Sequence, residues 1–293
     1  MKTACLLFLS AASVASAQKT PRLPEGVFAE RDVVYGETED GPLTLDVYKP
    51  TAVSESLPVV VFVHGGGWKG GDKRAAVNNA VWLVPEGYAV VSINYRLTDV
   101  ARWPAQIEDC YAAVRWVRAN AERHGFRADR VAAWGTSAGG HLAGLMGTRP
   151  DPDAAKHERD SRVQAVVDWF GPSDLLTMPP NVVSETRTKE QVAASNGAKL
   201  LGSPVPDVPE LAKDASPLHH VSADDPPFLV MHGSADPGVP LTQSKRLHEA
   251  LKAARVDSTL KVLDGAGHGG KAFQTDEART AVREFLKSTV GRP

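Results

Sequence analysis

A serine between two glycines constrains the fold of this chain more than any other feature. Residues 135–139 have the sequence Gly-Thr-Ser-Ala-Gly, a G-x-S-x-G pattern centred on Ser137. An apolar run precedes it at 131–134, and small residues with helical spacing follow it at 138–146. This context predicts a strand-turn-helix elbow, because a Cβ on either glycine would crowd a strained turn. The elbow exposes the Ser137 hydroxyl and puts the Ala138 amide at a helix N-terminus, where negative charge is stabilised. The alternative is a glycine-rich turn that happens to contain a serine.

The rest of the chain alternates stretches typical of strands and helices. We expect strands at 27–35, 43–48, 59–63, 89–95, from 131 to the elbow, and at 163–170, 228–232 and 258–263. We expect helices at 75–84, 105–124, 138–146, 241–254 and 275–289. The first two strands predict an antiparallel hairpin, and the later alternation predicts right-handed crossovers. The fold class is therefore α/β, with a mostly parallel eight-stranded sheet and helices on both faces.

One long segment interrupts the alternation. Residues 172–227 are rich in Pro, Ser and Asp and show a helical pattern only at 189–201. A segment of this length between two core strands is usually functional. We therefore predict a small cap or lid insertion over the site.

The C-terminal half supplies an acid and a base that would activate Ser137. Asp236 follows one core strand and His268 follows the next, each in a glycine-containing turn. A serine hydroxyl needs such a base, and the base needs an orienting carboxylate. The alternatives are an ordinary turn aspartate and a loop histidine. Asp264 competes for the acid role but lies too close to His268 in sequence, and His141 is expected to pack near the elbow.

A glycine run after the 59–63 strand predicts an oxyanion hole. Residues 64–68 are His-Gly-Gly-Gly-Trp, and their glycines let backbone amides point beside the nucleophile. We expect Gly66 and Gly67 to donate together with Ala138. A phosphate-binding loop is the alternative, but the sequence has neither G-x-x-x-x-G-K-[ST] nor a G-x-G-x-x-G that opens a helix.

Two tryptophans are candidates for contact with a substrate. Trp68 is predicted to line the acyl pocket, and Trp169 ends a strand on the expected pocket side. For each, the alternative is a place in the scaffold. In the same region, Arg96 and Asp109 have a spacing that permits a buried ion pair.

Composition excludes several function classes. The 293 residues are 42% hydrophobic and 23% charged, which suits one large domain or at most two, and we expect a single domain at 18–293. The formal net charge of −2, with scattered Lys and Arg, predicts no nucleic-acid surface. The sequence has no H-E-x-x-H and no C-x-x-C, so we expect no metal and no cofactor.

The first residues predict export. Lys2 precedes an apolar run at 4–14, and Ala-Ser-Ala follows at 15–17. This pattern is typical of a signal peptide, residues 1–17, with cleavage before Gln18. The run is too short to span a membrane, and no later segment reaches about 20 apolar residues. We expect a periplasmic or secreted protein in which Cys110, the cysteine left after cleavage, is buried.

Taken together, these motifs resemble the α/β-hydrolase superfamily. More narrowly, the chain is similar to the exported bacterial branch of feruloyl-esterase-like and acetyl-xylan-esterase-like proteins, near the hormone-sensitive-lipase group. The likeness rests on residues 64–68, 94–96, 115–117, 135–140 and 170–174, together with Asp236 and His268. The hormone-sensitive-lipase group carries a larger N-terminal cap than this sequence shows, which favours the feruloyl or acetyl branch.

The resemblance implies a carboxylic-ester hydrolase with Ser137 as nucleophile, His268 as base and Asp236 as its partner. The expected substrates are short acyl or feruloyl esters of carbohydrate, as small molecules or on a polysaccharide. An amide hydrolase, either a peptidase or an arylformamidase, would use the same three residues. A non-catalytic binding protein on a hydrolase scaffold is a third hypothesis.

Overall fold

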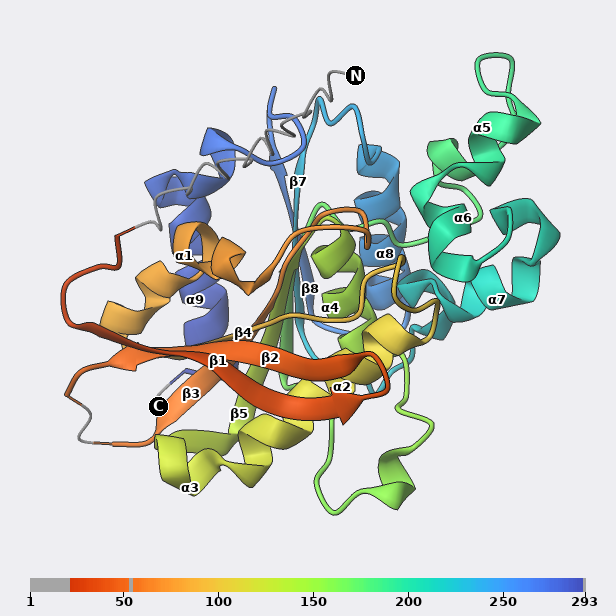
Figure 1. The fold of residues 1–293 in the computed structure, drawn as a ribbon. Coiled ribbons are helices and arrows are strands. Elements are labelled where there is room, and N and C mark those ends of the chain that lie inside the picture. Colours follow the sequence, from red (N-terminus) through yellow and green to blue (C-terminus); the bar gives the residue numbers. More distant parts are fainter. Residues whose placement is uncertain (1–21, 53–54, 292–293) are drawn as a thin grey trace, which may run out of the picture.

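The computed structural model describes residues 22–52 and 55–291 and contains one eight-stranded sheet (Figure 1). The strands lie in the order β1-β2-β4-β3-β5-β6-β7-β8. The pairs β1–β2 and β2–β4 are antiparallel, and every pair from β4 to β8 is parallel. The predicted fold class is confirmed, including the N-terminal antiparallel hairpin.

The bounds of the elements follow. The strands are β1 Val27–Thr38, β2 Gly41–Pro50, β3 Leu57–Val63, β4 Ala89–Ile93, β5 Phe126–Thr136, β6 Ala165–Trp169, β7 Phe228–Gly233 and β8 Ser258–Leu263. The α-helices are α1 Ala76–Asn79, α2 Ala105–Ala119, α3 Ala121–His124, α4 Ala138–Thr148, α5 Lys189–Ala193, α6 Asn196–Leu201, α7 Pro209–Asp214, α8 Leu241–Ala253 and α9 Asp276–Thr289. Short 3-10 helices are η1 Lys73–Ala75, η2 Val81–Glu86, η3 Ala154–Lys156, η4 Pro179–Asn181, η5 Val205–Asp207, η6 Pro217–His220 and η7 Lys271–Gln274.

Helices cover both faces of the sheet, so the central strands are buried on two sides. All of β3 is buried, and its side chains alternate between two hydrophobic clusters. Val61 belongs to the cluster with α2, α4 and α8, whereas Phe62 belongs to the cluster with α1 and α9. The same helices lie on opposite sides of the sheet in Figure 1. This two-sided burial explains the unbroken apolar run of β3.

Two helices differ from the sequence prediction. The stretch at 75–84 does not form one helix, because α1 is a single turn between the 3-10 helices η1 and η2. Pro85 lies inside η2 and has no amide hydrogen to continue an α-helix. The predicted helix at 105–124 divides at Asn120 into α2 and α3. Gly125 then ends α3 in the left-handed conformation, with φ at +71°.

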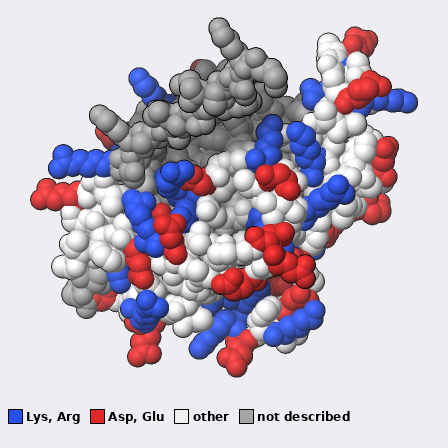
Figure 2. Space-filling model, in the orientation of Figure 1, with Lys and Arg blue, Asp and Glu red and all other residues white. Residues whose placement is uncertain are grey.

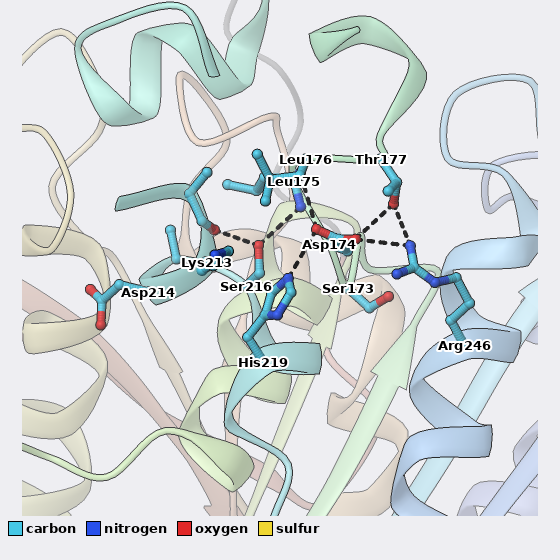
Figure 3. A network of polar contacts seen from close by, with 12 residues as sticks. Ser173, Asp174, Leu175, Leu176, Thr177, Lys213, Asp214, Ser216, His219 and Arg246 are labelled. Atoms are coloured by element: carbon cyan, nitrogen blue, oxygen red, sulfur yellow. Dashed lines mark hydrogen bonds and ion pairs between the residues drawn. The ribbon is translucent and has the colours of Figure 1, made fainter. Parts of the chain in front are cut away.

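The segment at 172–227 contains three short α-helices and three 3-10 helices, and side chains help to attach it to the body. Helices α5, α6 and α7 gather on one side of the sheet, beyond α8 (Figure 1). Figure 3 shows the attachment around Asp174, whose buried carboxylate accepts from Thr177 Oγ1 at 2.9 Å and from Arg246 on α8 at 2.8 Å. Within the segment, the Leu175 amide donates to Ser216 Oγ at 3.0 Å. Burial alone would raise the pKa of Asp174, but the bonds from Thr177 and Arg246 hold that pKa below its usual value.

Candidate active site

The elbow at Ser137 has the strained geometry that its sequence predicts. Ser137 connects β5 to α4 with φ at +56° and ψ at −120°. A Cβ on Gly135 would lie 2.0 Å from the carbonyl oxygen of Gly139, and a Cβ on Gly139 would lie 2.0 Å from that of Val63. Both positions therefore require glycine. Such strain is characteristic of functional positions, and here it holds the serine at the edge of the sheet.

Ser137, His268 and Asp236 form a continuous hydrogen-bonded chain. The Ser137 hydroxyl lies 2.8 Å from His268 Nε2, and His268 Nδ1 lies 2.6 Å from Asp236 Oδ2. A carboxylate only accepts, so His268 Nδ1 carries the proton and Nε2 is free to accept from the serine. The structure thus brings together the three residues that the sequence places in separate loops.

Asp236 is held from several directions. Its side chain is fully buried, and Oδ1 accepts the amides of Gly238 and Val239 at 2.8 and 2.9 Å. His232 Nε2 lies 3.3 Å from Asp236 Oδ2 and 2.8 Å from the carbonyl oxygen of Val239. That carbonyl can only accept, so His232 Nε2 is the protonated nitrogen. His232 therefore supports the turn that carries Asp236.

The competing carboxylate has another partner. Asp264 Oδ1 accepts from Ser234 Oγ at 3.0 Å, and among the described residues it makes no hydrogen bond or ion pair with His268. The Ser234 hydroxyl in turn accepts the amide of Gly265 at 2.7 Å. Asp264 thus belongs to the turn that precedes His268, and Asp236 is the aspartate in contact with the histidine.

Three backbone amides are available beside Ser137. Gly66, Gly67 and Ala138 line the same cavity as the serine. The N–H groups of Gly66 and Gly67 have no hydrogen-bond acceptor among the described residues, and Ala138 is the first residue of α4, whose amide has no partner within the helix. Gly66 and Gly67 have φ of +122° and +61°, which explains the glycines. These amides can donate hydrogen bonds to a bound oxygen on which negative charge develops.

Trp68 lines the cavity, and a hydrogen bond to His141 holds its indole ring. Its indole Nε1 donates to His141 Nδ1 at 3.2 Å, and His141 Nε2 donates to the carbonyl oxygen of Ala215 at 2.6 Å. Burial lowers the pKa of His141 to about 4, so the ring is neutral and can accept from Trp68. His141 thus packs beside the elbow as expected and links Trp68 to the segment at 172–227.

The prediction for Trp169 is wrong. Its side chain is 1% exposed and does not line the cavity with Ser137. The ring packs between Trp134 and Phe273 in the core on the α9 face of the sheet. Strand β6 ends at Trp169, and its side chain points into that core rather than toward the site because side chains alternate along a strand. The residue contributes through its backbone instead, since its carbonyl accepts the amide of Ser137 at 2.8 Å.

A buried carboxyl group lies directly beneath the elbow. Asp168 on β6 is buried, and burial raises its pKa to about 7 although its Oδ1 accepts the amide of Gly171 at 2.9 Å. The same oxygen would lie 2.4 Å from a Cβ on Gly140. Asp168 therefore packs against the start of α4.

The predicted ion pair between Arg96 and Asp109 is also present, with Arg96 Nη2 and Asp109 Oδ1 2.7 Å apart.

The segment at 172–227 supplies much of the cavity wall, through residues that no sequence motif indicates. The cavity has a volume of about 560 Å³ and includes Ser137 and His268. From the segment, its lining residues are Pro172, Met178, Pro180, Asn181, Arg187, Ala194, Ser195, Asn196 and Gly197. These positions follow no motif, and only the tertiary fold brings them to the site.

Further expectations concern the chain as a whole. Among residues 22–52 and 55–291, no group of three or more His, Cys, Asp or Glu could hold a metal ion, and no helix has the length and apolarity needed to cross a membrane. Cys110 is buried as expected. Basic and acidic side chains are intermingled on the described part of the face in Figure 2. The predicted signal peptide, residues 1–17, lies outside the described residues.

Comparison with known proteins identifies the family. The BD-FAE family model matches residues 45–251, which is more than half of the chain. The chain belongs to the BD-FAE family. A solved relative, a truncated form of a carbohydrate esterase from gut microbiota, matches this BD-FAE chain with a TM-score of 0.79 and 30% identity, over 91% of this chain and 98% of that one. The native Est2 esterase of Thermogutta terrifontis matches with a TM-score of 0.73 and 26% identity, over 94% and 97% of the two chains.

A curated relative extends the likeness to sequence. Esterase LipC of Mycobacterium tuberculosis is 35% identical to this BD-FAE chain over 260 residues. The match covers 85% of this chain and 61% of that relative, so the chain spans about three fifths of its length. The fold and these relatives put this BD-FAE member in the esterase group of the α/β-hydrolases, near the hormone-sensitive-lipase group.

Proposed function

We propose that this chain is a serine carboxylic-ester hydrolase that works through an acyl-enzyme. The observation that carries the proposal is the hydrogen-bonded chain from Ser137 through His268 to Asp236, at 2.8 and 2.6 Å, on the wall of a cavity. The esterase relatives support the same reaction class.

The mechanism follows from the donors and acceptors. Ser137 Oγ attacks the ester carbonyl carbon while His268 Nε2 takes its proton. The oxyanion that forms accepts hydrogen bonds from the amides of Gly66, Gly67 and Ala138, each worth roughly 3 kcal/mol in the transition state. Collapse of the intermediate breaks the bond to the alcohol oxygen, and His268 returns the proton to the departing alcohol. Water then repeats the two steps on the acyl-enzyme and releases the acid, without a cofactor.

We further propose that the substrates are short acyl or feruloyl esters of carbohydrate. Support comes from the carbohydrate esterase among the solved relatives and from the neutral hydrogen-bonding groups of Asn181, Ser195 and Asn196 in the cavity wall. In this proposal Trp68 borders the acyl group and the segment at 172–227 acts as a cap that contacts the alcohol.

We also propose that the chain is exported. The support is the sequence pattern of residues 1–17, with a basic start, an apolar run and Ala-Ser-Ala at its end. N-terminal sequencing of protein from the native host should begin at Gln18. Recovery of protein from the cytoplasm with Met1 intact would contradict export.

The function is tested on a panel of substrates. The panel contains p-nitrophenyl acetate, butyrate and octanoate, methyl ferulate and acetylated xylan, each with wild type and Ser137→Ala. We expect hydrolysis by wild type and a rate close to background in the variant. Equal rates in the two proteins would contradict the mechanism. Inactivity on every ester, with turnover of an N-formyl arylamine or a peptide amide, would favour the amide-hydrolase hypothesis.

A further inference from the structure

A permanent positive charge faces the cavity beside Ser137. Among the described residues that line this cavity, Arg187 carries a charge at every pH, and none is an aspartate or a glutamate. The other polar side chains from the segment, including Asn181 and Asn196, are neutral. Arg187 therefore adds a positive charge to a wall whose lining side chains include no carboxylate, and the nearby Asp236 carboxylate lies behind His268, to which it is bonded.

Arg187 is held in place, but its outer nitrogens are free. Its amide donates to the carbonyl oxygen of Ser184, and its own carbonyl accepts the amide of Ser184, both at 3.1 Å. Its Nε donates to the carbonyl oxygen of Pro180 at 2.9 Å. The two terminal nitrogens have no hydrogen-bond or ion-pair partner among the described residues. The guanidinium is thus anchored at one edge and presents its other donors.

A second unpaired donor lies closer to the proposed oxyanion hole. The side-chain amide of Asn196 makes no hydrogen bond to any described residue. Its Nδ2 would lie 2.4 Å from a Cβ on Gly67, so it packs against the backbone that we assign to the oxyanion. Arg187 and Asn196 therefore extend the set of free donors from the reacting bond into the cap.

We propose that this cavity selects esters that carry a carboxylate, and that Arg187 binds that carboxylate. The terminal nitrogens of a guanidinium match the two oxygens of a carboxylate, and such bonds are about twice as strong as neutral ones. This inference rests on the proposed esterase function and adds the charge of its substrate. The carboxylate can belong to the alcohol or to the acyl group, and the experiment separates the two.

The test compares two matched pairs of esters. In the first, 4-acetoxybenzoate and 4-acetoxybenzamide release the same acetyl group, and their alcohols differ in charge but hardly in size. In the second, monoethyl succinate and ethyl pentanoate release the same ethanol. Their acyl chains differ at the far end, which is a carboxylate in the first and an alkyl group in the second. For each pair we measure the ratio of kcat/KM, charged over neutral. Comparing this ratio between protein variants cancels the intrinsic reactivity of the esters.

Three variants complete the design. Arg187→Gln removes the charge and the fork, whereas Arg187→Lys keeps the charge alone. Lys189→Gln is the matched control, because Lys189 is exposed, lies on the same cap at the start of α5 and does not line the cavity. It removes one positive charge without removing a proposed contact.

We expect Arg187→Gln to lower the ratio at least about tenfold in one pair, mainly through KM, because a hydrogen-bonded ion pair is lost. The ratio for Arg187→Lys should lie between those of wild type and Arg187→Gln. The ratio for Lys189→Gln should stay within about twofold of wild type. The pair that responds identifies the side of the ester. An unchanged ratio in both pairs for Arg187→Gln, or an equal fall in Lys189→Gln, would overturn the inference while leaving the esterase function intact. Absence of Ser137-dependent hydrolysis of all four esters would instead overturn the proposed function, and this inference with it.

Discussion

The sheet edge that carries Ser137 and the segment at 172–227 are built by different means. At the edge, backbone meets backbone: Cβ atoms on Gly135 and Gly139 would lie 2.0 Å from carbonyl oxygens. The segment is attached to the rest of the fold mainly through side chains, as in the bond from Arg246 on α8 to Asp174 (Figure 3). The first arrangement tolerates almost no change, whereas the second can vary residue by residue. We infer that the edge sets the chemistry and that the segment sets the substrate.

The largest expected effect lies at the edge. Asp236→Asn should lower kcat by about 10⁴-fold, because an amide in place of the carboxylate favours the wrong tautomer of His268. Asp264→Asn is the matched control, since Asp264 bonds Ser234 instead of the histidine. Initial rates with p-nitrophenyl acetate measure both. Similar losses in the two variants would contradict the assignment of Asp236.

The next effect concerns pH and the carboxyl group beneath the elbow. The pKa of Asp168 is raised by burial from 3.8 to about 7, so between these pH values the folded state binds more protons than the unfolded state. Its contribution to stability is therefore fully present at low pH and is lost as pH rises toward 7. Asp168→Asn removes this loss. The free energy of unfolding of the variant, relative to wild type, should increase by up to about 4 kcal/mol across this range. Urea denaturation of both proteins at a series of pH values measures this difference in the free energy of unfolding. A difference that does not change with pH would contradict the raised pKa of Asp168.

A smaller effect tests the close backbone packing at the elbow. Gly139→Ala should destabilise the fold by about 3 kcal/mol, because the new methyl group would overlap the carbonyl of Val63. Gly144→Ala is the control on the same helix, where a Cβ meets only the side chain of Pro217 at 3.3 Å. Thermal unfolding compares the two. Equal stability of the two variants would show that the elbow has more freedom than its geometry implies.

The smallest effect is expected in the segment. Arg246→Gln removes one bond to the buried Asp174 carboxylate, which keeps its bonds from Thr177 Oγ1 and the Leu176 amide, so stability should fall by about 1–2 kcal/mol. Because the bond helps to attach the segment at 172–227, which lines the cavity, KM should change more than kcat. Lys245→Gln, its exposed neighbour on α8, is the control. A large fall in kcat with unchanged KM would contradict the division of roles between edge and segment.

The sequence predicted the edge better than the segment for a physical reason. The requirements at residues 135–139 are local, because the turn needs glycine on both sides of Ser137. The flanking strands and helices are indicated by the periodicity of their apolar residues. Asp236 and His268 were found because parallel strands end at one edge. Trp169 was misassigned because sequence does not reveal which face of a strand a terminal side chain takes. Arg187 and Asn196 were missed because nothing in the sequence indicates which loop residues reach the cavity.

The most direct test of the account is covalent labelling of the serine. Wild type, Ser137→Ala and His268→Ala are treated with a fluorophosphonate, and the label is located by peptide mass spectrometry. The account predicts one label per chain, on the peptide that contains Ser137, with no label in Ser137→Ala and slow labelling in His268→Ala. A label on another residue, or equal labelling rates in wild type and His268→Ala, would contradict the claim that His268 activates Ser137.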